Sequence, residues 1–338
     1  MHAPHLSGML ISQKHDKRKR QPQITQIKNH MGAKEKSYYC LQITTLGCFL
    51  VFLSSCQAWA QPAEYSQGQA IGTVTAAEVT EASGMVASRT QPDLLWVHND
   101  SGHSASIYAV TPQGTLLASY GVAGATMRDW EDIALGPGPK PEQDYLYIGD
   151  VGDNQGHRES ITVYRIPEPK VQSKPTIAPL RTDPAQALRL VYPDGPRDAE
   201  TLLVDPLTKD LYIISKRDLF SRVYHAPYPH STESPITLKL VTLMPWGFAV
   251  GGDISPDGQA ILVRGMFNAS QFKRVSHEPL WKAFRGSHER IPIQAEPQGE
   301  AICFDAHRRG YYTLSEGKNQ PIYYYQPIPL VNNLDKNE

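Results

Sequence analysis

A short acidic motif recurs along the chain about every 50 residues. The clearest copies span residues 128–133, 197–202 and 298–302, and weaker copies span 82–85 and 251–254. One column of the aligned copies reads Ser83, Glu131, Glu200, Gly252 and Glu300, at intervals of 48, 69, 52 and 48 residues. Such a period is typical of repeat proteins in which each copy is one supersecondary unit.

Each copy is followed by short segments with the composition of β-strands. Apolar runs rich in aromatic and β-branched residues span 94–98, 145–148, 211–214, 260–263 and 311–314. Segments containing a Tyr follow at 107–108, 163–167, 223–227 and 323–327, and fourth segments at 116–122, 188–192, 236–243 and 290–294. Runs of this kind, bounded by Gly, Asp or Pro, indicate strands. Four strands in each repeat predict an all-β fold, a β-propeller of four-stranded blades.

We predict five blades. The last repeat has no clear fourth strand, and residues 70–76 could supply it, which would join the chain ends and close the ring. Six blades are the alternative, because the interval between Glu131 and Glu200 is about 20 residues longer than one blade. That interval is too short for two blades, and its Pro-rich segment 167–187 indicates a surface excursion. Helical spacing within 277–286 predicts a short helix in the fourth blade.

The first 60 residues differ in composition from the repeats. Residues 1–30 are polar and basic, whereas Met31 is followed by lysines, an apolar run over 41–53 and small residues at 58–60. This order predicts a signal peptide over 31–60, with residues 1–30 as a non-native or disordered extension. Cleavage after Ala60 would release a periplasmic or extracellular protein. Lipidation at Cys56, which follows a lipobox-like Leu-Ser-Ser sequence, would instead anchor it to a membrane.

Residues 61–330 are expected to form one monomeric propeller domain, followed by a disordered tail over 331–338. Three of the four cysteines lie in the leader, which leaves Cys303 alone and excludes a disulfide or a thiolate metal site within the mature chain. The formal net charge is −1 and the basic residues of the repeats are scattered, which argues against a nucleic-acid partner. The chain also lacks a Gly-x-Ser-x-Gly elbow and a His-Glu-x-x-His motif.

The connectivity of a propeller blade should bring the acidic column to the axis. The start of the first strand and the end of the second lie at the same end of an antiparallel sheet, and the first strand is innermost. Converging carboxylates repel one another, and Ca²⁺, which takes six to eight oxygen ligands, would compensate them. We therefore predict a Ca²⁺ site at Ser83, Glu131, Glu200 and Glu300. The alternative is a structural role, in which these glutamates hydrogen-bond to the backbones of neighbouring blades and form ion pairs with Arg128, Arg197 or Arg264.

Polar residues at the ends of the second strands should share this face. We predict that an anionic small molecule binds at Asn99, Asp100, Arg128, Arg158, Arg197, Lys216 and Arg264. Arginine is suited to bidentate capture of phosphate or carboxylate. In a hydrolytic reaction the predicted catalytic residues are Asp129, Asp150 and Asp153, which would position water beside the metal. For residues 99–102 and 150–154, ordinary turn chemistry is the alternative explanation.

The polar segments together resemble a group of secreted bacterial β-propeller proteins near the phytase-like (esterase-like phytase) propellers. The segments that carry the resemblance are 99–102, 129–132, 149–154 with Arg158, 192–195, 198–200, 253–258 and 298–301. The resemblance implies a fold more specifically than an activity. The acidic column is also similar to the central calcium ring of five-bladed calcium-activated nucleotidases, from which Gly252 departs.

Two functions therefore remain open at this stage. The first is an exported, calcium-dependent propeller that binds a phosphorylated or other anionic small molecule, with hydrolysis of a phosphoester as the reaction it would support. The second is a non-catalytic propeller of the cell envelope in which an axial ion joins the blades.

Overall fold

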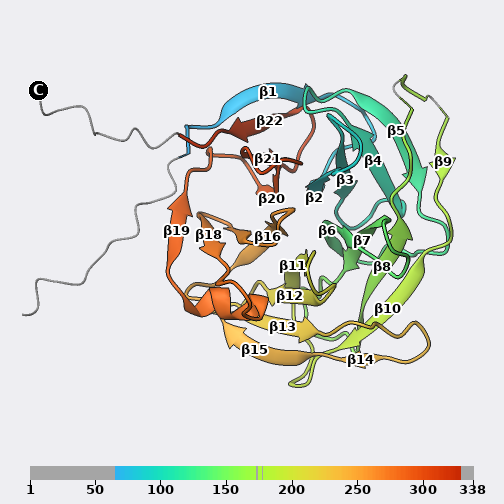
Figure 1. The fold of residues 1–338 in the computed structure, drawn as a ribbon. Coiled ribbons are helices and arrows are strands. Elements are labelled where there is room, and N and C mark those ends of the chain that lie inside the picture. Colours follow the sequence, from blue (N-terminus) through green and yellow to red (C-terminus); the bar gives the residue numbers. More distant parts are fainter. Residues whose placement is uncertain (1–64, 173, 177, 329–338) are drawn as a thin grey trace, which may run out of the picture. The chain divides into compact units, whose positions relative to one another are not determined.

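Five β-sheets succeed one another along the chain, and each is one blade of a propeller (Figure 1). The computed structural model describes residues 65–172, 174–176 and 178–328. The predictions for the leader, for Cys56 and for the tail 331–338 lie outside the described residues. Among the described residues, no helix has the length and apolar character that crossing a membrane requires.

The blades follow the predicted order of strands. The first contains β2 (Ala82–Ala87), β3 (Leu95–Asn99), β4 (Ser106–Val110) and β5 (Leu116–Gly121). The second contains β6 (Trp130–Pro137), β7 (Asp144–Asp150), β8 (Ile161–Pro167) and β10 (Gln186–Val191). The third contains β11 (Ala199–Val204), β12 (Leu211–Ser215), β13 (Arg222–Ala226) and β15 (Lys239–Leu243). The fourth contains β16 (Ala249–Ile254), β17 (Ala260–Gly265), β18 (Ala269–Lys273) and β19 (His288–Ile291). The fifth contains β20 (Gly299–Phe304), β21 (Tyr311–Ser315), β22 (Gln320–Tyr325) and β1 (Gln69–Val74).

The first strand of each repeat is innermost, as predicted. Strands β2, β6, β11, β16 and β20 pack against one another around the axis (Figure 1). All residues of β2, β11 and β16 are buried, so these strands lack the apolar–polar alternation of a strand with one wet face. Large side chains fill the space between blades; Trp96 and Trp130, for example, are fully buried in one apolar cluster.

The ring closes through the N-terminal strand. Strand β1 pairs antiparallel with β22, from Gln69 opposite Tyr324 to Val74 opposite Gln320. This confirms that the segment ahead of the first repeat supplies the missing strand of the last blade. Pairing the ends of the chain covers an edge that would otherwise expose unpaired backbone groups.

We expect a chain that begins at Ala76 to lose the closing strand and much of its stability. The fifth blade would then expose the backbone edge of β22 and the apolar surface that Val74 covers. Thermal unfolding should show a midpoint lower by about 10 °C or more, or the chain should aggregate. A chain that begins at Tyr65 is the control and should unfold like the full chain; equal midpoints for both shortened chains would contradict the role of β1.

The long interval between the second and third copies holds no sixth blade among the described residues. Instead, β9 (Leu180–Arg181) leaves the second blade and pairs in parallel with β5 of the first. A similar segment, β14 (Ile236–Thr237), leaves the third blade and pairs in parallel with β10 of the second. The predicted helix is a 3-10 helix, η1 (Leu280–Arg285), between β18 and β19. Five blades are therefore confirmed.

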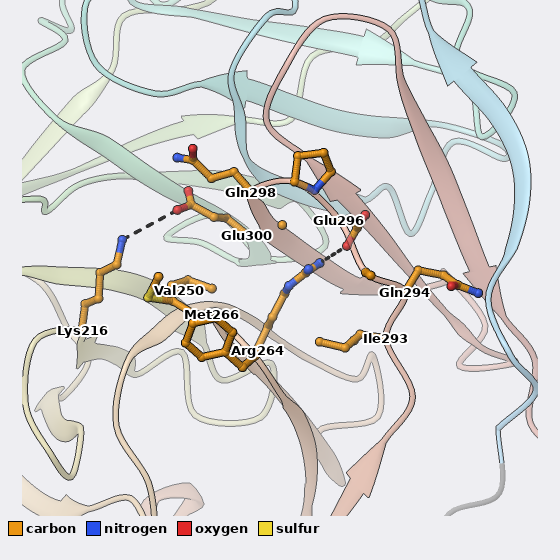
Figure 2. Close-up of a pocket in the computed structure, with 13 residues that line it drawn as sticks. Lys216, Val250, Arg264, Met266, Ile293, Gln294, Glu296, Gln298 and Glu300 are labelled. Atoms are coloured by element: carbon orange, nitrogen blue, oxygen red, sulfur yellow. Dashed lines mark ion pairs between the residues drawn. The ribbon is translucent and has the colours of Figure 1, made fainter.

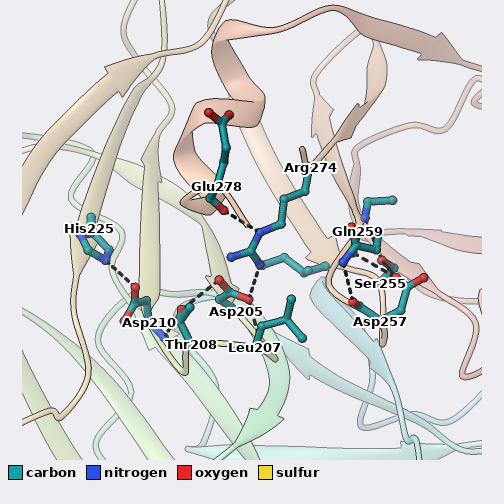
Figure 3. A network of polar contacts seen from close by, with 12 residues as sticks. Asp205, Leu207, Thr208, Asp210, His225, Ser255, Asp257, Gln259, Arg274 and Glu278 are labelled. Carbon is teal, nitrogen blue, oxygen red and sulfur yellow. Dashed lines mark hydrogen bonds and ion pairs between the residues drawn. The ribbon is translucent and has the colours of Figure 1, made fainter. Parts of the chain in front are cut away.

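Polar contacts also join blades at the end of the ring where the innermost strands finish (Figure 3). The Arg274 guanidinium, after β18, bonds the buried Asp205 carboxylate after β11 at 2.9 Å. Its Nε donates to the carbonyl of Glu278. Nearby, His225 Nε2 lies 2.9 Å from Asp210. This network links the third and fourth blades at the face opposite the predicted site.

Candidate functional site

Every innermost strand carries a β-bulge at the same level of the ring. The bulge leaves one residue in each strand without a partner in the ladder. The bulged residues are Ser83, Glu131, Glu200, Val250 and Glu300. A bulge redirects the side chain of the extra residue, so the repeated defect gives the acidic column its common position at the axis.

In the fourth blade the predicted alignment was wrong by two residues. Gly252 pairs with Val263 inside the ladder, whereas Val250 occupies the bulge. Val250 lies 50 residues after Glu200 and 50 residues before Glu300, so the corrected spacing is also the more regular one. The fourth blade therefore contributes an apolar side chain, and the three glutamates come from the second, third and fifth blades.

A hydroxyl group and an ammonium group connect this ring. The Ser83 hydroxyl donates to the Glu131 carbonyl at 2.6 Å and lies 3.4 Å from Glu300 Oε2. The Lys216 ammonium, directly after β12, bonds the Glu200 carboxylate and lies 3.7 Å from Glu300 Oε1. The ion-pair alternative is thus realised in part, but its cation is Lys216 and not one of the three arginines that the sequence suggested.

Other carboxylates gather around Glu131 in two overlapping groups. One group is formed by Asp100, Asp129 and Glu131, and the other by Glu131, Asp198 and Glu200. In each group, one oxygen from every residue lies within 4.8 Å of the others. Together these five acids are the axial acid cluster. Carboxylates at this separation could hold a metal ion.

A buried glutamate oxygen and a closely packed glycine also favour a metal ion in this cluster. Glu200 is 3 % exposed, yet its Oε2 has no hydrogen-bond partner among the described residues. A buried carboxylate oxygen is costly unless hydrogen-bonded or charge-compensated. Gly152 lies against the cluster, where a Cβ would overlap the carboxylate oxygens of both Glu131 and Asp129. Only glycine leaves room for those carboxylates as they stand.

Burial and mutual repulsion raise the pKa values of carboxyl groups in the acid cluster. Burial, followed by the Glu200 carboxylate, raises the pKa of Glu131 well above its usual value. Burial and then Glu300 raise the pKa of Glu200 to about 8, against the lowering effect of Lys216. The pKa of Asp129 rises to about 6 through burial and then Asp100. Without a compensating cation the folded chain therefore holds protons here near neutral pH.

The predicted basic residues share the face of the acid cluster, but most are already neutralised. Arg158 Nη1 bonds Asp150 at 2.8 Å. Arg197 lies 3.1 Å from Asp194, and Arg264 lies 2.6 Å from Glu296. Arg128, unlike these three arginines, is exposed to solvent, and it lines a cavity of about 320 Å³ together with Asp129. An anion would therefore find little uncompensated positive charge on this face.

Three of the residues predicted to bind ligand or to be catalytic instead accept hydrogen bonds from the backbone of nearby loops. Asn99 accepts the N–H groups of Thr80 and Glu81 on its Oδ1, so its amide fixes the entry to β2. Asp153 accepts the N–H groups of His157 and Arg158, one on each oxygen. Asp150 accepts the N–H of Asp129 and the Arg158 guanidinium on the same oxygen. These contacts match the turn-chemistry alternative. Among the three predicted catalytic carboxylates, Asp129 is the one that belongs to the acid cluster and is partly exposed.

The sequence interpretation missed Asp198 and Glu316. Asp198 precedes Glu200 by two residues, just as Asp129 precedes Glu131, so the repeated motif carried that signal. Glu316 follows β21, and burial and then Glu300 raise its pKa to about 9. Asp100 follows the second strand of the first blade in the same position as Glu316 in the fifth, so the repeat carried a signal for Glu316 as well.

A hollow lined by Lys216 and Glu300, which adjoin the acid cluster, lies over the third, fourth and fifth blades. It has a volume of about 590 Å³, which is in the range of small-molecule sites. Figure 2 shows Lys216 and Glu300 on the left and the Arg264–Glu296 ion pair to their right, all lining this hollow. We call this space the axial cavity. Val250, the bulged residue of the fourth blade, also lines it.

The fold and this site define a five-bladed β-propeller with a buried acid cluster at its axis that could hold a metal ion. No protein-family model matches the chain, and no curated protein sequence matches it. Among solved structures, the soluble aldose sugar dehydrogenase from Escherichia coli, in its apo form, aligns with a TM-score of 0.44 and 8% sequence identity. The alignment covers 78% of this chain and 100% of that chain. A likeness this distant carries no information on activity.

Proposed function

We propose that the chain is an exported propeller that binds Ca²⁺ in the axial acid cluster. The observation that carries this proposal is the convergence of four carboxylates on Glu131, with a buried Glu200 oxygen that lacks a hydrogen-bond partner among the described residues. Ca²⁺ accepts many oxygen ligands in irregular geometry, which suits acids contributed by separate strands and loops. Of the ligands predicted from sequence, Glu131 and Glu200 belong to this cluster, whereas Ser83 and Glu300 adjoin it beside Lys216.

We further propose that the bound cation recruits a phosphorylated or other anionic small molecule, as the resemblance to phytase-like propellers suggested. Three arginines on this face and Lys216 are already paired with carboxylates, so the positive charge for an anion would come mainly from the ion, near the edge of the axial cavity where Lys216 lies. In a hydrolytic reaction the ion would polarise the phosphoryl group, and Asp129, which is partly exposed, would orient water.

A panel of phosphoesters, assayed with Ca²⁺ and with chelator, tests the catalytic part. Turnover that requires Ca²⁺ and falls by about a hundredfold in Asp129→Asn would support it. The second candidate is the non-catalytic envelope propeller. One observation favours it: Glu131 and Glu200 lie on neighbouring innermost strands of two different blades. An ion bound between them would therefore join the second and third blades. Ca²⁺-dependent stabilisation with no turnover of any ester would select this second candidate.

Replacing Lys216 should strengthen Ca²⁺ binding. The Lys216 ammonium competes with any metal ion for Glu200, and its removal in Lys216→Met would leave that carboxylate to the metal. We expect Ca²⁺ affinity to rise by about tenfold in calorimetric titration. The matched control is Lys282→Met, which removes a distant surface ion pair with Glu278 and should leave the affinity unchanged. Weaker Ca²⁺ binding in Lys216→Met would contradict the competition.

A further inference from the structure

The axial cavity has two chemically different walls. Lys216 and Glu300 lie at the end next to the acid cluster, and the buried Arg264–Glu296 pair lines the same space. The remaining wall is largely apolar; its apolar members are Val250, Met266, Phe267, Ile293, Ala295 and Pro297. A cavity with charged groups at one end and an apolar wall suits a ligand of the same polarity.

The apolar wall continues into side chains that the protein leaves exposed. Phe267 is 83 % exposed and Met266 is 49 % exposed, both in the loop between β17 and β18. Phe248, 46 % exposed, lies beside them, because the Met266 N–H donates to its carbonyl at 3.3 Å. The Phe248 N–H in turn donates to the Lys216 carbonyl at 2.9 Å, which ties this apolar rim to the lysine of the site.

Exposed apolar groups beside a charged cavity indicate a surface that a ligand covers. Phe267 is held at the mouth of the cavity by a tight connection, in which the Gly265 N–H donates to the Asn268 carbonyl at 2.7 Å. A wholly polar ligand would leave this side chain in water. A ligand with an apolar part would remove Phe267 and Met266 from water as it binds, and that removal would add to its affinity.

We propose that the ligand of the axial cavity is an amphipathic anion, with a phosphate-like head and an alkyl or aryl chain. The head lies at the Lys216 end, next to the ion in the acid cluster, and the chain lies along Ile293, Met266 and Phe267. This proposal rests on the proposed function, because the head binds through the axial cation. It adds the substrate class, which the charged groups alone do not define.

The test compares alkylphosphonates, which resist hydrolysis and differ only in chain length. Methyl-, butyl- and octylphosphonate are titrated calorimetrically into the full chain with saturating Ca²⁺ and, separately, with chelator. We expect affinity to rise with chain length, by about a hundredfold or more from methyl to octyl, because each of the seven added methylenes contributes at least about twofold when buried. With chelator, the binding of all three should be lost.

Two variants separate the cavity wall from general surface hydrophobicity. Phe267→Ser should weaken octylphosphonate about tenfold and leave methylphosphonate unchanged. Leu219→Ser is the matched control: Leu219 is 77 % exposed, but it is not among the residues that line the axial cavity. It should therefore leave both affinities unchanged. Both replaced side chains are largely in water, so both variants should fold.

The possible outcomes separate the proposal of an amphipathic ligand from the proposed Ca²⁺-dependent anion site on which it rests. Ca²⁺-dependent binding of all three phosphonates with equal affinity overturns the amphipathic ligand and leaves the anion site standing. Binding of none of them, by a chain that still binds Ca²⁺, overturns both. Equal loss of octylphosphonate affinity in Phe267→Ser and Leu219→Ser, or binding only to octylphosphonate held in lipid vesicles, also overturns the proposed place of the chain in the cavity.

Discussion

Saturating Ca²⁺ should raise the melting temperature of the wild-type chain by about 5–10 °C, and Glu131→Gln should remove most of that increase. Glu131 belongs to both groups of the acid cluster, so its replacement takes a charge and an oxygen ligand from each. A ligand present at a hundred times its dissociation constant stabilises the folded state by about 2.7 kcal/mol. The measurement is thermal unfolding followed by circular dichroism, with Ca²⁺ and with chelator.

The matched control for this experiment is Glu316→Gln. Glu316 is buried and also has a raised pKa, but it belongs to neither group of converging carboxylates. Its variant should keep the Ca²⁺ response of the wild type. A wild-type chain that shows no response at millimolar Ca²⁺ would remove the metal site altogether. A full response in Glu131→Gln would place the ion somewhere other than the axial acid cluster.

The fold could be predicted from sequence because its signals are local and repeated. All five blades contain an apolar second strand, four have a Tyr-containing third strand and three begin with a clear acidic motif, so the copies reinforce one another. Closure by β1 followed from counting strands in the last repeat. The Pro-rich segment was recognised as an excursion, but its pairing with β5 of the preceding blade was not, because two residues of parallel strand leave no periodic signal.

The positions of the axial residues could be predicted only where the repeated motif is clear. The sequence alignment placed Ser83, Glu131, Glu200 and Glu300 at equivalent positions, and these four residues do occupy the bulges. Val250 was missed because a bulge is a property of strand register, and the adjacent glycines imitate a polar motif. Lys216 directly follows Ser215, which pairs with Ala199 beside Glu200, so the strand pairing brings it to this carboxylate. From sequence, Lys216 could be placed on this face, but the arginines were assigned as the cations, because the spacing of residues does not give side-chain contacts.

Proton binding by the acid cluster leads to the last prediction: metal-free protein should become less stable as pH rises from about 6.5 to about 9. A carboxyl group whose pKa is higher in the folded state binds more protons folded than unfolded, so its contribution declines as pH rises towards the folded pKa. The pKa of Glu200 is about 8 and that of Glu316 about 9, in each case mainly because of burial. We expect the free energy of unfolding to fall by several kcal/mol over this range.

The lower limit of that range is set by two buried histidines with the opposite sign. Burial lowers the pKa values of His98 and His230 to about 4, so these rings are neutral when folded. Their contribution rises with pH up to the unfolded value near 6.5 and therefore opposes the carboxyl groups below it. Above about pH 6.5 the histidines no longer contribute a slope, and the acid cluster should dominate. Chemical denaturation at a series of pH values measures the effect.

Glu200→Gln and Ca²⁺ should each reduce this slope, for different reasons. The variant has no proton to lose at position 200, so metal-free Glu200→Gln should be more stable than the wild type at pH 8.5 and less dependent on pH. Ca²⁺ would replace the protons of the acid cluster with a cation that remains bound at high pH, so the loaded wild type should lose less stability than the metal-free protein over the same range. A metal-free wild type whose stability is constant or rising between pH 6.5 and 9 would mean that the axial carboxylates are already compensated. Lys216 would then be sufficient as their cation, and the case for a metal ion would be lost.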